Sequence, residues 1–226
     1  MMANLWRTGR YEGCEEGGNQ PHRGVLKVFF RHDKQFDSTK HNKFLHVLLP
    51  EPGFDSKYMI FKRLFRPKER PERGLYAAIV AAARHVQFYQ KMGVADTIDG
   101  RFEMIVLHLF LVLNRLKGEG VEELRQNLTD EFFRDMDGSL RELGVNDVTV
   151  GKKVRKLAES YYGRVLAYDK AIGQPEVLEE TIIRNIYADG TTADCVKAMC
   201  QYILSATKAL NKVPLDSIRR SELNFQ

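Results

Sequence analysis

The stretch "RFEMIVLHLFLVLNRLKGEG", residues 101–120, is the most apolar part of the chain and contains one histidine, His108. Its apolar run, residues 105–113, is far shorter than the roughly 20 residues that a membrane-spanning helix needs. Apolar residues recur at spacings of three and four around most of its circumference, which predicts a central helix packed by several neighbours. Thr97 is the expected N-cap and Gly118 the expected stop.

Helical patterns continue on both sides of this stretch, and glycine or proline separates them. They predict further helices within residues 74–93, 120–144, 147–173, 175–190 and 192–212. We therefore expect an all-α domain, a compact array of about six antiparallel or orthogonal helices. The 226 residues, 43% of them hydrophobic, suffice for one core of good size. Three cysteines without C-x-x-C spacing argue against a disulfide scaffold and fit a reducing compartment.

The positive charge is concentrated before the helical body. Residues 1–58 carry nine Lys/Arg against seven Asp/Glu, residues 59–73 six against two, and residues 74–226 20 against 21. Residues 1–58 lack a helical pattern, so we expect a weakly ordered extension or a start codon assigned too early; an accessory hairpin is the alternative. The helical domain is expected to cover residues 74–226.

Residues 59–73 form a short basic amphipathic segment. Its apolar side chains share one helical side and its cations surround them: Phe61, Leu64 and Phe65 on the apolar side, with Lys62, Arg63 and Arg66 around it. Such a segment suits an anionic membrane surface, to which each cation contributes about 1 kcal/mol. The alternative is a solvated tail.

A search for catalytic chemistry finds little. The chain has no metalloprotease or zinc-finger spacing, no G-x-S-x-G and no phosphate-binding loop. The acidic cluster of Asp130, Glu131, Asp135 and Asp137 is typical of a solvated face, with magnesium binding as the alternative. For His108 we expect a core histidine with one hydrogen-bonded nitrogen; haem ligation, a proton role or partner contact are the alternatives.

A second basic group lies on the helix predicted within residues 147–173. Lys152, Lys153 and Lys156 gather opposite its apolar stripe, and Arg164 continues the group. The group is either a solvated face or a binding surface for an acidic protein or RNA. The neighbouring Tyr162 favours binding, because aromatic residues often anchor interfaces.

Two stretches show a family resemblance. "DTIDGRFEMIVLHLFLVLNRLK" and "FFRDMDGSLRELGVNDVTVGKKVRKLAESYYGRVLAYDKAI" resemble the ubiquinol–cytochrome c chaperone family. The specific blocks are D-G-R-F, F-F-x-D-M-D-x-x-L-R-E, G-V-x-D-x-x-V-G-K-K-V-[RK]-K and Y-Y-G-R-x-x-A-Y, in that order. The likeness runs from near Met59 to about Ala209 and leaves residues 1–58 outside it.

The resemblance implies an assembly chaperone rather than an enzyme, without a cofactor. Its partner would be newly made cytochrome b or another subunit of the cytochrome bc complex, with a small co-chaperone and the ribosome as further contacts. The implied location is cytoplasmic, peripheral on the inner face of a bacterial inner membrane. The contact residues that the motifs and the basic face suggest are Asp99, Arg101, Phe102, His108, Asp135, Met136, Arg141, Glu142, Lys152, Lys153, Lys156, Tyr162, Gly163, Arg164 and Tyr168.

Two other function classes stay open. One is a helical enzyme or haem-handling protein, which needs a polar pocket that joins His108 and Asp135. The other is a regulator that binds the ribosome or RNA. Gly163 is expected in mid-helix, where it costs about 1 kcal/mol relative to Ala, so we expect a close helix contact there.

Overall fold

The computed structural model describes residues 70–188 and 190–225, and every regular element in these ranges is a helix. The expected all-α class is confirmed. Six helices have 11 residues or more and two have five. In chain order they are α4 (Pro71–Ala83), α5 (Val86–Gln90), α6 (Ile98–Arg115), α7 (Glu122–Glu142), α8 (Asp147–Ala171), α9 (Pro175–Asn185), α10 (Ala193–Lys212) and α11 (Leu215–Arg219).

Helix α6 is the central helix, as its apolar pattern predicts. Every residue from Phe102 to Leu113 is buried. The hydroxyl of Thr97 accepts a hydrogen bond from the Gly100 amide at 3.1 Å, which confirms the expected N-cap. Helices α4, α8 and α10 pack against α6, and α7 packs against α4 and α8. None of the described helices is both long enough and apolar enough to cross a bilayer.

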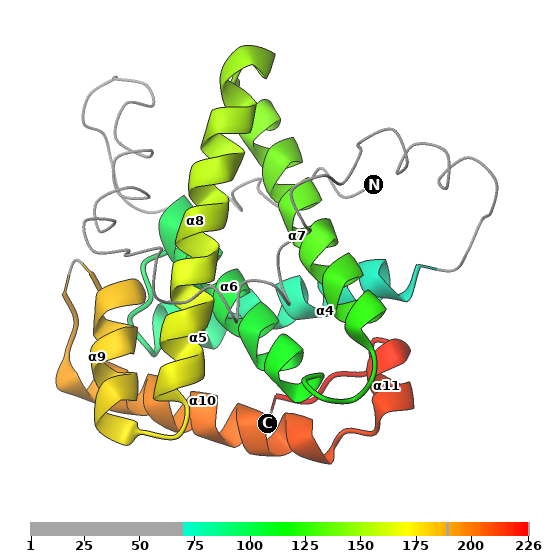
Figure 1. Cartoon of the computed structure of the whole chain (residues 1–226). Helices are drawn as coiled ribbons and strands as arrows, with labels where there is room; N and C mark the ends of the chain where they lie inside the picture. The colour runs from blue at the N-terminus through cyan, green and yellow to red at the C-terminus, as the bar shows by residue number, and fades with distance from the viewer. Residues whose placement is uncertain (1–69, 189, 226) are drawn as a thin grey trace.

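Helices α7 and α8 form a long hairpin whose turn projects away from the rest of the molecule (Figure 1). Helix α10 runs across the opposite end, α9 connects α8 to α10, and α11 lies beside α4. The hairpin therefore presents its turn at one extreme of the fold.

Several details of the helix boundaries differ from the sequence prediction. Helix α4 begins at Pro71 rather than at residue 74, and α9 ends at Asn185, before residue 190. Residues 74–93, expected as one helix, divide into α4 and α5 because His85 is extended, with φ −61° and ψ 127°. The break turns Phe88 into the core, where its ring lies 5.4 Å from the His108 ring. The short helix α11, which follows Pro214, is not predicted. Residues 1–58 and the proposed membrane segment, Phe61 to Arg66, lie outside the described residues.

Candidate partner-binding surface

His108 belongs to the core. Its side chain is fully buried, Nδ1 lies 2.7 Å from the Met104 carbonyl oxygen, and Nε2 lies 2.7 Å from the Tyr202 hydroxyl. Because a carbonyl only accepts, Nδ1 carries the proton and Nε2 accepts from Tyr202. Burial lowers the pKa of His108 to about 4, so the ring is neutral. With both nitrogens occupied inside the core, His108 offers no site to a haem iron, a substrate or a partner.

Three other residues that the family motifs suggest as contacts are also buried. Phe102, Met136 and Tyr168 expose 3% of their surface or less. Phe102 packs against Phe132, and Tyr168 packs against Phe110. These residues hold helices together and have no surface for a partner in this conformation. The motifs combine core and surface positions, and only the fold separates the two.

Arg164 was expected on a solvated binding face, and this expectation is wrong. Its Nε donates to both carboxylate oxygens of Glu103 at 2.7 Å, and 19% of the Arg164 side chain is exposed against 8% of Glu103. The guanidinium also lies 5.6 Å from the centre of the Phe102 ring. Burial raises the pKa of Glu103, and the charge of Arg164 opposes that shift. Arg164 therefore joins α8 to α6.

Gly163, the neighbour of Arg164, was expected to mark a close helix contact. A Cβ atom built on Gly163 meets no atom of the described residues within 4 Å. The expectation is therefore wrong, because this side of α8 is open. The glycine that does mark a close approach is Gly100 of the D-G-R-F block, where a Cβ would lie 2.0 Å from the Ala95 carbonyl oxygen.

The polar residues near the start of α6 and on α7 have partners within the chain. Asp135 accepts a hydrogen bond from the Tyr76 hydroxyl at 2.8 Å, and burial raises the pKa of Asp135. Arg101 donates to Asp96 at 2.7 Å, and Asp99 is half-buried in the first turn of α6. Asp135 and His108 thus have separate partners. Among the described residues, no three His, Cys, Asp or Glu side chains lie close enough to hold a metal ion.

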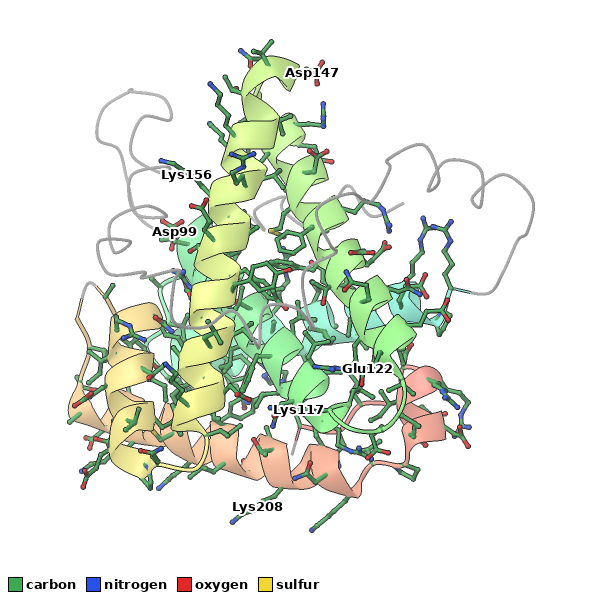
Figure 2. The ribbon with its side chains drawn as sticks, viewed as in Figure 1. Asp99, Lys117, Glu122, Asp147, Lys156 and Lys208 are labelled. Atoms are coloured by element: carbon green, nitrogen blue, oxygen red, sulfur yellow. The ribbon has the colours of Figure 1, made fainter. Side chains whose placement is uncertain are left out.

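The exposed residues of the predicted set all lie on the α7–α8 hairpin, with two half-buried residues beside them. Arg141, Glu142, Lys152 and Lys156 are exposed, and Lys153 and Tyr162 are half-buried. Figure 2 shows the Lys156 side chain directed away from α8. Tyr162 lies beside Tyr161 and Phe133, with ring centres 5.1 and 6.2 Å away. These six residues are hereafter the hairpin surface.

Two parts of this region are not among the residues predicted from the sequence. Arg155 is exposed on α8 and follows Lys152 by three residues, so the helical period alone could have identified it. The other part is apolar: Leu143 and Val148, on either side of the turn, are 51% and 85% exposed. Their exposure depends on the way the hairpin projects, which no local pattern reveals.

The exposed residues of the predicted set thus lie on one helical hairpin of an all-α domain. The chain belongs to the Ubiquinol-cytochrome C chaperone family, whose model matches residues 90–225. The match begins later than the expected start near Met59 and continues beyond the expected end near Ala209 to Phe225. It includes all helices from α6 to α11.

Known relatives support this assignment. Over 115 residues the chain is 24% identical to ubiquinol-cytochrome-c reductase complex assembly factor 1 of Xenopus laevis, which covers 50% of this chain. Over 151 residues it is 22% identical to the protein of the same name from Drosophila melanogaster, which covers 63% of this chain. The chain spans 58% of the length of each of these relatives.

A solved structure gives a further comparison. The crystal structure of the Cbp3 homolog from Brucella abortus is 36% identical to this chain, with a TM-score of 0.64. The likeness covers 75% of this chain and 96% of the Brucella chain. The helical arrangement described above is therefore shared with a protein whose structure has been solved.

Proposed function

We propose that this protein is an assembly chaperone that binds newly made cytochrome b and promotes biogenesis of the ubiquinol–cytochrome c reductase complex. The observation that carries the proposal is the family match over residues 90–225, together with relatives named as assembly factors of that complex. The burial and double hydrogen bonding of His108 agree with it, because they leave no accessible imidazole for catalysis at this position.

We further propose that the hairpin surface is where the protein contacts its client. The exposed lysines of α8 would steer encounter with an acidic segment, since charges at an interface act mainly on association and specificity. The half-buried Tyr162 would supply an aromatic anchor. Phe102, His108, Met136, Arg164 and Tyr168 are no longer part of the proposed surface, because they hold the core together.

Isolation of the protein with its client tests the function. Cells that express the tagged full chain are pulse-labelled, their membranes are solubilised, and the captured subunits are identified. We expect labelled cytochrome b in the captured fraction, and a loss of the assembled complex in cells that lack the protein. A normal level of the complex in those cells, together with no capture of cytochrome b by the folded protein, would contradict the proposal.

A double substitution tests the surface. Lys152→Glu with Lys153→Glu should change the free energy of unfolding by about 0.5 kcal/mol or less, because Lys152 is exposed, Lys153 is only half-buried, and surface charges away from special contacts have small effects. The level of the assembled complex should fall. Leu109→Asp is the control for a folding defect, since it places a charge on a fully buried position of α6. If the double variant assembles a normal complex, these lysines are not the client surface.

A further inference from the structure

The turn between α7 and α8 presents a small apolar tip. Val148 is 85% exposed and Leu143 is 51% exposed, although both are aliphatic. The tip lies at the projecting end of the hairpin, where Figure 2 labels Asp147, beside Val148 in the sequence. Scattered apolar residues on a surface are ordinary, but here two occur together at an extreme of the molecule.

The backbone of the turn holds these side chains outward. The Val145 amide donates to the Leu140 carbonyl at 3.1 Å and the Gly144 amide to the Arg141 carbonyl at 2.9 Å, the pattern of a Schellman motif. Gly144 has φ +82°, as the motif requires. The Asn146 side chain then caps α8 by accepting from the Thr149 amide at 3.0 Å. The tip is thus a built turn that needs no partner to take its shape.

Cations follow the apolar tip along the same side of α8. The helical period places Lys152, Arg155 and Lys156 on the side of Val148, opposite the buried Val150 and Leu157. Within the described part of the chain, neither Lys152 nor Arg155 has an ion pair or a side-chain hydrogen bond. Residues 141–156 carry five Lys/Arg against two Asp/Glu, whereas residues 157–226 carry eight against nine.

The acidic groups near the tip are only partly neutralised, because the turn has one arginine, Arg141, against three carboxylates, Asp137, Glu142 and Asp147. Arg141 donates to Asp137 at 2.7 Å and also forms an ion pair with Asp147, so one guanidinium engages the carboxylates on both sides of the turn. Glu142 is exposed and contributes one negative charge. Two exposed aliphatic side chains, Leu143 and Val148, thus lie at the projecting end of the hairpin, and the positive charge lies behind them on α8.

We propose that this tip, Leu143 and Val148 with Lys152, Arg155 and Lys156 behind it, binds an anionic phospholipid surface. Interfacial binding requires apolar side chains that enter the headgroup region and cations that meet anionic lipid, and the tip supplies both. A stable protein interface buries about 800 Å² on each partner around aromatic or arginine anchors, and two aliphatic side chains cover only a small part of that area. The tip shares Lys152 and Lys156 with the hairpin surface, so the lipid contact would hold the rest of that surface close to the membrane.

Binding of the full chain to protein-free vesicles tests the proposal independently of the proposed function. Vesicles of phosphatidylcholine alone are compared with vesicles that also contain phosphatidylglycerol. Lys152→Gln with Arg155→Gln should weaken binding to the anionic vesicles roughly tenfold or more. The matched control, Lys208→Gln with Lys212→Gln on the exposed side of α10, should bind as the native protein does.

The apolar part has its own test, in which one variant should bind better. Val148→Ser should weaken vesicle binding, whereas Ile183→Ser, at a 47% exposed position of α9, should not. Val148→Trp should strengthen binding, because Trp favours the membrane interface. With Trp6→Phe in the same chain, the introduced indole becomes the single tryptophan, and its emission should shift to the blue on anionic vesicles.

Two results would overturn the proposal. In the first, all the tip variants bind vesicles as strongly as the unsubstituted protein, and the emission of the introduced tryptophan does not shift. Any lipid binding would then belong to another part of the chain, such as residues 59–73. In the second, the variants bind vesicles as strongly as the unsubstituted protein but lower the level of the assembled complex in cells. That outcome would make the tip a protein contact.

Discussion

At the scale of single residues, the pair Glu103–Arg164 places the Glu103 carboxylate in the core, beside the guanidinium of Arg164. Arg164 donates to both oxygens of Glu103, which satisfies the buried carboxylate, and also to the Ser160 hydroxyl and carbonyl, which satisfies the guanidinium. A buried pair of this kind adds little net stability compared with apolar residues, but the loss of one partner leaves a buried charge uncompensated. This asymmetry makes the pair testable.

We expect Arg164→Ala to lower the free energy of unfolding by about 3 kcal/mol near neutral pH. Burial already raises the pKa of Glu103, and removal of Arg164 takes away the charge and hydrogen bonds that lower it. The folded variant therefore takes up a proton more readily than the unfolded chain, and the deficit should shrink as the pH falls towards about 5. Urea denaturation of the native protein and the variant at several pH values measures this difference in the free energy of unfolding.

The matched control is Arg155→Ala, which removes an exposed arginine from the same helix and should cost less than about 0.5 kcal/mol. Equal losses in the two variants would mean that the buried pair has no special role.

His108 gives the opposite dependence on pH. Burial lowers its pKa from 6.5 to about 4, so between these values the unfolded chain binds a proton that the folded protein does not. Stability should be complete above about pH 6.5 and fall by up to about 3 kcal/mol as the pH drops to about 4. His108→Gln should be less stable at neutral pH, because it disturbs the hydrogen bond from Tyr202, yet lose less on acidification.

His85 is the control, since it is exposed at the break between α4 and α5. His85→Gln should keep the acid-dependent loss of the native protein. If His108→Gln keeps the same loss as well, another group causes it.

The sequence predicts well which side of its own helix a residue occupies. It predicts poorly which residue of another helix that side contacts. The period of α8 correctly places Lys152 and Lys156 on the exposed side and Leu157 inside. The position of Arg164 is decided by Glu103, which lies 61 residues earlier and on another helix. The predicted contact set mixed core and surface residues for the same reason, because a family motif records both.

At the scale of helices, local signals predict the long elements well. The Thr97 cap, Pro175 in the first turn of α9 and the glycines after α6 and α7 act within a few residues, so the sequence predicts the approximate bounds of α6, α7 and α8 and the start of α9. The division between α4 and α5 has no such signal. It occurs because Phe88 packs against His108 and Tyr202, a contact between distant parts of the chain.

Two helical glycines, Gly100 in the first turn of α6 and Gly163 in the middle of α8, give a matched prediction at this scale. Gly100→Ala should destabilise the protein by about 2 kcal/mol or more, because its Cβ would lie 2.0 Å from the Ala95 carbonyl oxygen and the backbone would have to move. Gly163→Ala should stabilise it by up to about 1 kcal/mol, since the space is open and Ala favours the helix. Thermal melts of both variants measure the difference. A loss at Gly163 would show that the expected close contact exists.

At the scale of the whole molecule, the folded unit begins before the family match. The match starts at Gln90, but α4 lies earlier and packs against both α6 and α7. Leu75, Tyr76 and Ile79 of α4 are buried, and the Tyr76 hydroxyl donates to Asp135. A chain without α4 would leave the side of α6 that faces it open to water, although α6 itself lies within the match.

Truncation distinguishes the extension from the folded unit. We expect a chain that begins at Met59 to keep the helical circular dichroism and the melting temperature of the full chain, because residues 1–58 lack the helical pattern and precede both α4 and the family match.

A chain that begins at Gln90 should lose cooperative unfolding. Each large aliphatic or aromatic side chain that α4 buries contributes about 1.5–3 kcal/mol, and several together approach the 5–15 kcal/mol that stabilises a typical domain. A cooperative melt for the chain from Gln90 would show that α4 is dispensable, and a lower melting temperature for the chain from Met59 would show that residues 1–58 support the fold.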